Sequence, residues 1–221
     1  MSKTLMDIDQ AFTQQYKGLL ETQRNISHAL ENYRFDLTTD EITRAVKERM
    51  MAFWYFNVHN CADLGREVNT VAADFFTETC LFFLKNCLKS YGLEVVSERD
   101  IRIDKNGRKE IRPDISIWKK RDPMLFDELV AVIELKVSNG WKGKTIYQHL
   151  ENRKKEIRNI YSGVFFGVIS FWNCFGDGFK SNDNSEYIGL YNFKSNPKGD
   201  HSSTKLTIEQ LLRQIVGETL G

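Results

Sequence analysis

The sequence predicts an α/β domain in which a central mixed sheet is flanked by helices. Segments of helical length alternate with short runs rich in β-branched residues, of which VAVIELKV at 130–137 is the clearest. The dipeptide Asn106-Gly107 separates two alternating runs, which is a strong hairpin signal. With 221 residues, 41% of them apolar and 28% charged, the chain is long enough for one well-buried domain and an accessory segment.

Two helices are expected in the N-terminal part of the chain, over residues 5–33 and 39–57. The second opens with the pattern of a capping box, in which Thr38 is followed by Glu41. The end of this helix is strongly apolar and must pack against another element. We therefore expect residues 1–62 to form a helical accessory region.

The remaining residues, 63–221, are expected to form the α/β domain. Its first helix should run from Leu64 to Tyr91 and end at Gly92. The apolar stripe of this helix would consist of Leu64, Val68, Val71, Phe75, Phe82 and Leu88. Strands are predicted over 93–103, 111–118, 130–137, 164–172 and 187–193, and further helices over 145–161 and from Thr207 onwards. The central order is therefore helix, three strands, helix, strand.

An acid and a lysine share one face of the strand at 130–137. Glu134 and Lys136 are two residues apart, so their side chains project from the same side of an extended chain. The residues between and beside them are apolar and face the other way. Two charged groups on one face of an otherwise buried strand are costly unless they serve each other or a ligand. The pattern indicates a functional site on that face.

A second carboxylate, Asp114, lies near the start of the preceding strand. If the connection over 119–129 is a hairpin centred near Met124, Asp114 lies directly across from Glu134. Two carboxylates and the Lys136 ammonium then converge at one edge of the sheet. Oxygen ligands of this kind suit Mg²⁺ or Mn²⁺ rather than zinc. Phosphodiester hydrolysis needs a cation, an activated water and stabilisation of negative charge, which this set can supply.

Pro113-Asp114 followed by Glu134-Leu135-Lys136 resembles the signature of the PD-(D/E)XK nuclease superfamily. That family includes many restriction endonucleases, Holliday-junction resolvases and DNA-repair nucleases. Its common core of helix, three strands, helix and strand matches the order expected over residues 64–172, which is roughly half of the chain. The resemblance therefore implies a restriction-endonuclease-like fold. A partly buried ion pair in an unrelated α/β fold is the alternative explanation of Glu134 and Lys136.

The same resemblance implies roles for the residues of the motif. Asp114 and Glu134 would ligate Mg²⁺, with Mn²⁺ as a substitute, and the backbone carbonyl of Leu135 would be a further ligand. Lys136 would orient or activate the attacking water, or stabilise the developing negative charge. The implied activity is that of a Mg²⁺-dependent DNA endonuclease of the restriction, defence or repair type, which acts on double-stranded DNA and is compatible with a homodimer.

Two other functions remain open from the sequence. One is a catalytically inactive module of the same fold that binds nucleic acid or a protein partner. The other is a protein-interaction domain that uses the aromatic surface of residues 51–56, which would require a large exposed apolar patch.

The PD-(D/E)XK family often adds a glutamate from the first core helix, and Glu78 and Glu67 are the candidates. A two-residue turn at Asn106-Gly107 would place Asp114 opposite Arg99. At about 3.3 Å per strand residue and about 1.5 Å per helix residue, Glu78 then lies at the height of that pair. Glu67 lies about three helical turns further away. Glu78 is therefore the preferred fourth residue; a solvated acidic face of the helix is the alternative explanation of both.

Contacts to nucleic acid are expected in the segment that follows Glu134. Lys142 and Lys144 lead into the next helix, and Gln148 lies within it, so these three side chains are placed to contact phosphates. Further along the same helix, phosphate contact and a solvated helix face explain the basic residues equally well, namely Arg153, Lys154, Lys155 and Arg158.

Composition excludes some classes of function. Lys and Arg (31) nearly balance Asp and Glu (30), so any basic surface for nucleic acid must be local. No stretch of about 18 uncharged apolar residues occurs and the first residues lack the apolar core of a signal peptide, so we expect a cytoplasmic protein without a membrane span. The cysteines lack CxxC spacing and are expected to be reduced thiols, namely Cys61, Cys80, Cys87 and Cys174.

Overall fold

The computed structural model of the chain describes residues 5–66, 73–104, 106, 108–120, 127–137, 144–173, 186–192 and 207–220. The chain divides into two compact units, Met1–Arg34 and Phe35–Gly221. The first unit consists of the helix α1 (Leu5–Leu30) and the turn that follows it. Large apolar side chains are exposed along this helix, namely Ile8, Phe12, Tyr16, Leu19, Leu20 and Ile26. None of the helices in the described part of the chain combines the length and the hydropathy needed to cross a bilayer.

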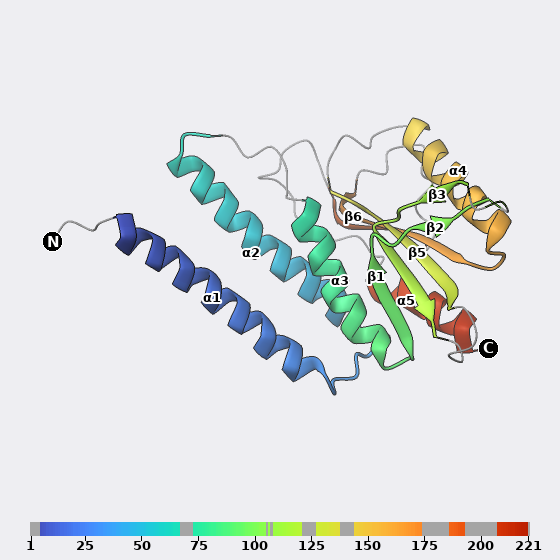
Figure 1. Ribbon diagram of the computed structural model, residues 1–221, viewed down its shortest axis with the longest axis horizontal. Helices are drawn as coiled ribbons and strands as arrows, with labels where there is room; N and C mark the ends of the chain where they lie inside the picture. The colour runs from blue at the N-terminus through green and yellow to red at the C-terminus, as the bar shows by residue number, and fades with distance from the viewer. Residues whose placement is uncertain are drawn as a thin grey trace. The chain divides into compact units, whose positions relative to one another are not determined.

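The second unit is built on strands β1 (Leu93–Ser97), β2 (Ile101–Arg102), β3 (Glu110–Ile111), β4 (Ile115–Lys119), β5 (Glu128–Lys136), β6 (Phe165–Asn173) and β7 (Tyr187–Asn192). Five of these strands form one sheet in the order β1-β4-β5-β6-β7. The pairs β1–β4 and β4–β5 are antiparallel, whereas β5–β6 and β6–β7 are parallel. The mixed sheet predicted from the sequence is therefore confirmed. Strands β2 and β3 form a separate ribbon between β1 and β4 in the chain (Figure 1).

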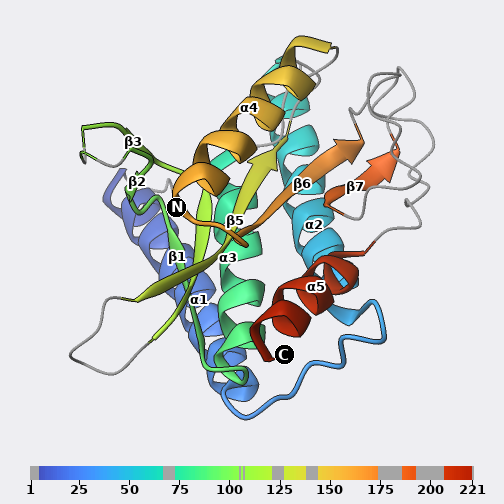
Figure 2. The same cartoon turned by 90° about the vertical axis from the view of Figure 1, so that its right-hand side faces the viewer.

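Helices α3 (Ala73–Lys89) and α4 (Lys144–Ile160) lie on opposite sides of this sheet, as Figure 1 and Figure 2 show. On one face, Leu150 and Ile157 of α4 are buried in a cluster that includes Phe166 of β6. On the other face, Phe76 of α3 contacts Phe171 of β6, with ring centroids 5.9 Å apart. Phe166 and Phe171 are an odd number of residues apart, so they project from opposite faces of the strand.

Along the chain the core runs α3, β1, β4, β5, α4, β6. The order of helix, three strands, helix and strand predicted from the sequence is thus confirmed. It is the order of the restriction-endonuclease-like core that the resemblance implies.

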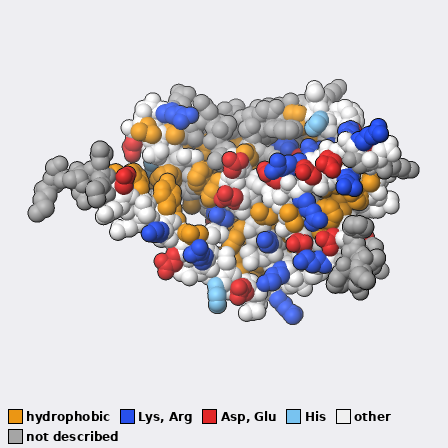
Figure 3. Space-filling view, in the orientation of Figure 1, with side chains coloured by type: hydrophobic (Ala, Val, Ile, Leu, Met, Phe, Trp, Pro, Cys, Tyr) orange, Lys and Arg blue, Asp and Glu red, His pale blue; other side chains and the backbone are white. Residues whose placement is uncertain are grey.

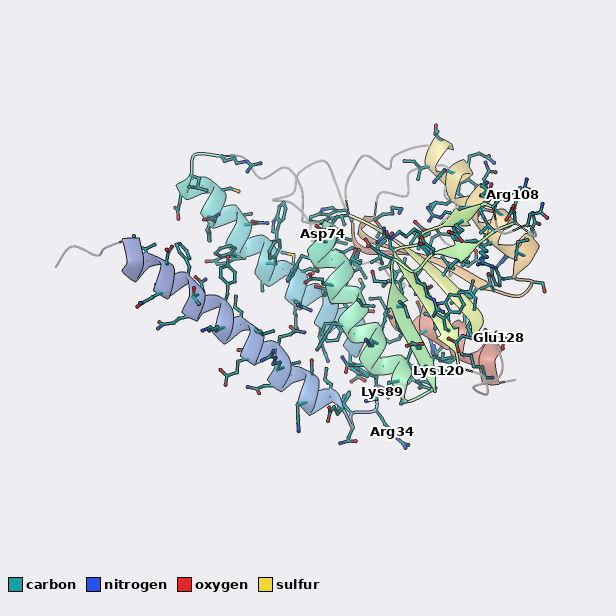
Figure 4. The ribbon with its side chains drawn as sticks, viewed as in Figure 1. Arg34, Asp74, Lys89, Arg108, Lys120 and Glu128 are labelled. Atoms are coloured by element: carbon teal, nitrogen blue, oxygen red, sulfur yellow. The ribbon has the colours of Figure 1, made fainter. Side chains whose placement is uncertain are left out.

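The first core helix begins later than predicted. Leu64, its expected first residue, is 71% exposed and follows the end of the preceding helix, and α3 starts at Ala73. Figure 4 labels Asp74 in its first turn and Lys89 in its last, which are favourable charges at the two ends of a helix. Of the predicted apolar stripe, Leu88 is buried and Phe75 and Phe82 are partly buried, whereas Val68 and Val71 lie outside the described residues. The buried side chains of α3 are those of Phe76, Thr79, Cys80, Leu84, Cys87 and Leu88. Phe75 of the predicted stripe instead stacks on Phe53, with centroids 4.2 Å apart.

The N-termini of helices α2 (Glu41–Asp63) and α5 (Ile208–Leu220) are linked by hydrogen bonds. The capping box expected at Thr38 and Glu41 does not form. Instead, the buried Glu209 carboxylate accepts hydrogen bonds from the backbone N–H groups of Ile42 (2.5 Å) and Thr43 (3.0 Å). Thr43 Oγ1 in turn accepts one from the first N–H of α5, at 2.8 Å. Each helix thus satisfies donors at the start of the other, and α2 belongs to the larger unit rather than to an accessory region ending at residue 62.

The hairpin around Asn106 has a longer loop than a two-residue turn. The Ile103 N–H donates to the Lys109 carbonyl at 2.9 Å, and Asp104 Oδ1 accepts the same lysine's N–H at 3.1 Å. A short polar side chain that accepts backbone N–H groups stabilises such a loop. The pairing across the ribbon is therefore shifted by one residue from the predicted register.

Candidate active site

The pairing of β4 with β5 places Asp114 across from Glu134. Ile115 pairs with Ile133, so the residues on either side of that pair face each other. This is the register expected for a connection centred near Met124, and it slips by one residue only nearer that connection, after Ile117. The two acidic residues therefore lie on neighbouring strands at the same level of the sheet.

The Lys136 ammonium lies between the two carboxylates. Its Nζ is 2.9 Å from Glu134 Oε2 and 3.5 Å from Asp114 Oδ2. The exposed fraction of the side chain is 4% for Glu134, 11% for Lys136 and 37% for Asp114. A carboxylate as buried as Glu134 has to be paired, and Lys136 supplies one partner. The structure thus brings together three residues that the sequence predicted as one site.

Asp114 is also bonded to the backbone of the strand that carries the other two residues. Its Oδ2 accepts a hydrogen bond from the Leu135 N–H at 2.7 Å. The N–H and C=O of one strand residue point to the same side, so the Leu135 carbonyl also faces β4. The carbonyl that the sequence predicts as a metal ligand therefore lies on the side of β5 where Asp114 is found.

Glu98 marks the point where β1 ends opposite Asp114. Its N–H donates to the Asp114 carbonyl at 3.3 Å, so the partner of Asp114 is Glu98 and not Arg99, as the two-residue turn predicted. Glu98 has φ of 53°, an uncommon conformation for a residue with a side chain. Arg112 holds this kink through an ion pair with the Glu98 carboxylate at 2.6 Å. These two contacts of Glu98 therefore hold the residues just before β4 to the end of β1.

Arg153 of α4 contacts Glu134, whereas the sequence reasoning considered this residue only as a phosphate contact or part of a solvated helix face. Its Nε lies 3.1 Å from Glu134 Oε1, and its NH2 donates to the Arg112 carbonyl at 2.9 Å. A signal was present, because Arg153 lies three residues after Leu150 and four before Ile157, both of which are buried. This spacing puts the guanidinium on the face of α4 that meets the sheet. The helix therefore contributes a cation to the site.

Two adjoining hollows lie along α4 beside these residues. The first, of about 480 Å³, is lined by Ile111, Arg112, His149, Asn152, Arg153 and Glu156. The second, of about 530 Å³, is lined by Thr145, Gln148, His149 and Asn152. Gln148, one of the predicted nucleic-acid contacts, is exposed and donates a hydrogen bond to Asn152 at 3.1 Å. Lys142 and the side chain of Lys144 lie outside the described residues.

Charges around the first hollow are mixed. On the face drawn in Figure 3, basic and acidic side chains are interspersed over β2, β3 and α4. Several are paired, including Lys109 with Glu156 at 2.6 Å and Arg102 with Glu110 at 3.7 Å. A nucleic acid at this surface would meet local cations rather than a uniformly positive field.

The predicted fourth residue, Glu78, is not brought to the carboxylate pair. It is exposed on α3, and its negative charge acts on Arg49 of α2, partly opposing the burial that lowers the pKa of that guanidinium. On α3, the negative charge of Asp114 acts on Cys80. Burial raises the pKa of the Cys80 thiol, and the Asp114 charge raises it further. The estimate of height along α3 was therefore close, but Glu78 points away from the sheet. Glu67 lies outside the described residues.

The donor atoms suit a hard divalent cation. Asp114 and Glu134 supply carboxylate oxygens, and Glu134 Oε1 is a buried acceptor that receives no hydrogen bond from the described residues. Within the described part of the chain, no three His, Cys, Asp or Glu side chains are grouped closely enough to hold a metal ion. The candidate site therefore fits a cation bound by two carboxylates and completed by a carbonyl and water.

Comparisons with known proteins give one structural similarity. No protein-family model matches the sequence, and none of the curated proteins matches it. The chain is similar to a chain of the native BbvCI A2B2 tetramer, with a TM-score of 0.48 and 15% sequence identity, over 96% of this chain and 90% of that chain.

Proposed function

We propose that this chain is a metal-dependent nuclease of the PD-(D/E)XK type that hydrolyses phosphodiester bonds in DNA. The observation that carries the proposal is the arrangement of Asp114, Glu134 and Lys136: two carboxylates on facing strands share one ammonium, at 3.5 and 2.9 Å. Both carboxylates lie at the same level of neighbouring strands, and carboxylate oxygens are the ligands that a hard divalent cation prefers.

In this proposal each residue has a distinct role. Asp114 and Glu134 would hold Mg²⁺, which Mn²⁺ could replace, and the Leu135 carbonyl would complete the protein ligands. When bound, the ion would polarise a phosphoryl oxygen and lower the pKa of a coordinated water. Lys136 donates hydrogen bonds to both carboxylates from a largely buried position. In the substrate complex its ammonium would orient that water or stabilise the negative charge that develops on the phosphate.

We further propose double-stranded DNA as the substrate and a homodimer as the active form, because a two-fold enzyme can cut both strands of a two-fold duplex. The two hollows along α4, whose lining runs from Glu156 to Thr145 and includes Arg153, support a path for a phosphate backbone next to the carboxylates. Lys142 and Lys144 remain predicted contacts in the neighbouring segment.

The test is cleavage of plasmid DNA by the purified protein with Mg²⁺, with Mn²⁺ and with EDTA. Asp114→Asn and Lys136→Met should each reduce the cleavage rate by at least about a hundredfold, because the first removes a charged metal ligand and the second removes a charge that acts on the water or the phosphate. Lys85→Met is a matched control, since that lysine is exposed on α3 and belongs to no predicted contact. Cleavage that persists in both site variants, or in EDTA, would overturn the proposal.

A second candidate is an inactive module of the same fold that binds nucleic acid. It is favoured by the lack of a third acidic ligand among the described residues. This function predicts binding of a labelled duplex without turnover and with no dependence on a divalent cation. Fluorescence anisotropy with and without Mg²⁺, beside the cleavage assay, separates the two.

A further inference from the structure

Both oxygens of the Glu134 carboxylate face a cation. Oε2 is 2.9 Å from Lys136 Nζ, and Oε1 is 3.1 Å from Arg153 Nε. The Glu134 side chain is 4% exposed and that of Arg153 is 20% exposed, so both charges lie largely out of water. A divalent cation that binds Glu134 must therefore approach an oxygen that already has a positive partner.

The two partners of Glu134 are held differently. Lys136 makes a hydrogen bond to Glu134 and a second one to Asp114. Arg153 Nε and Glu134 Oε1 are close, but both atoms are buried without a hydrogen-bonding partner in the part of the chain that the structure describes. The distance shows an ion pair and the geometry excludes a good hydrogen bond, so this contact is mainly electrostatic. Arg153 donates a hydrogen bond to the Arg112 carbonyl at 2.9 Å but none to Glu134, so at the Glu134 carboxylate it is the easier of the two cations to replace.

We propose that Arg153 is a built-in counter-cation of Glu134 that competes with the divalent metal ion for the Oε1 oxygen. This role of Arg153 rests on the metal site of the proposed function. A residue of α4 would then control how tightly that site binds the metal ion. With Arg153 in place, the guanidinium offsets the buried carboxylate while no metal is bound. When a divalent cation binds, the two positive charges repel each other across a few ångströms of partly buried space.

The displaced guanidinium can move into a neighbouring hollow. Arg153 lines the hollow of about 480 Å³ that is also lined by His149, Asn152 and Glu156. Glu156 is three residues further along α4, which is within reach of an arginine side chain on the same helix. Water in this hollow can therefore solvate the guanidinium once it leaves Glu134, and the Glu156 carboxylate, which is paired with Lys109 at 2.6 Å, can accept it as a second partner. Metal binding would thus move a cation into the surface that the proposed function assigns to phosphate.

The test is calorimetric titration of Mn²⁺ into the full-length protein without DNA. Arg153→Met should bind Mn²⁺ about tenfold more tightly than the wild type, because a competing charge is removed. Arg153→Lys, which keeps a cation on a different stem, should lie between them. Arg158→Met is the matched control, since it removes a cation from the same helix that pairs with Glu186 instead. Glu134→Gln in the wild-type background should abolish the binding that Arg153→Met strengthens.

The outcomes separate this inference from the function it rests on. Mn²⁺ binding that is unchanged or weaker in both Arg153 variants overturns the competition while leaving the metal site intact. Absence of Mn²⁺ binding in the wild type and in both variants overturns the metal site as well. Should Arg153→Met fail to fold, Arg153→Lys decides alone: affinity above that of the wild type supports the inference, and equal or lower affinity overturns it.

Discussion

The Asp114 carboxylate accepts a hydrogen bond from the Leu135 N–H at 2.7 Å, so the predicted metal ligand on β4 is also bonded to the backbone of β5. Asp114 thus has two separable contributions. Its oxygen satisfies a buried donor, which any acceptor of the same shape can do. Its negative charge serves Lys136 and the proposed cation, for which an amide is a poor replacement.

We therefore expect Asp114→Asn to leave the free energy of unfolding within about 1 kcal/mol of the wild type, and Asp114→Ala to lower it by about 1–3 kcal/mol. Both should lose DNA cleavage. Urea denaturation followed by circular dichroism measures the first quantity, with Asp100→Asn as an exposed control. Equal destabilisation by Asn and Ala would show that the hydrogen bond to Leu135 contributes little.

Glu209→Ala should be among the most destabilising single substitutions in the chain. The carboxylate is fully buried and accepts the first N–H groups of α2, so its removal leaves two donors without a partner. We expect the free energy of unfolding to fall by about 3 kcal/mol or more, and by less for Glu209→Gln, which retains an acceptor oxygen. Glu48→Ala, on the exposed side of α2, is the control. A loss below about 1 kcal/mol for Glu209→Ala would contradict the capping role.

Stability should fall in alkali through the buried thiol of Cys87. Burial, with the nearby charges of Glu209 and Glu41, raises the pKa of this thiol from 9.0 to about 12. In the unfolded chain the thiol ionises near pH 9, so between pH 9 and 12 the folded state binds the extra proton and stability decreases as pH rises. Between pH 9 and 12, the Cys87 thiol lowers the free energy of unfolding by about 1.4 kcal/mol per pH unit. Cys87→Ala should show a correspondingly shallower decline in urea midpoints from pH 8 to 11, and parallel curves would contradict the prediction.

Residues 35–221 should fold without the first 34. The second compact unit begins at Phe35, and among the described residues the buried apolar core comes from Phe35 or later. A fragment that starts at Phe35 should therefore unfold cooperatively with nearly the wild-type midpoint. A fragment starting at residue 63, the boundary expected from the sequence, should fail to fold because it lacks α2 and its mutual capping with α5. A folded 63–221 fragment would contradict this role of α2.

Much of the candidate site could be read from local patterns. The two-residue period of a strand is enough to put Glu134 and Lys136 on one face, and the length of the connection at Met124 is enough to set Asp114 opposite Glu134. Helix geometry also gave the approximate height of the site along α3. Each of these deductions uses only the spacing of residues that are close in sequence.

Orientation around a helix axis was harder to predict. Glu78 and Cys80 differ by two residues, which is more than half a turn, so an error in the buried stripe reverses which side chain faces the sheet. The stripe was misplaced because Phe75 packs on Phe53 of α2, and aromatic residues that contact a neighbouring helix look the same in sequence as those that contact a sheet.

The sequence by itself determined the element order, the mixed sheet and the alignment of Asp114, Glu134 and Lys136, since these follow from hydrophobic period and connection length. Only the tertiary structure decided that Arg153 points at Glu134 and that Glu209 caps a helix 167 residues away from it in sequence. Polar contacts between distant segments leave no periodic trace, because one suitable side chain is enough to make each of them. Burial makes these contacts necessary, because a charge or a backbone N–H without a partner is costly away from water. The side chain that is nearest in space has to supply that partner.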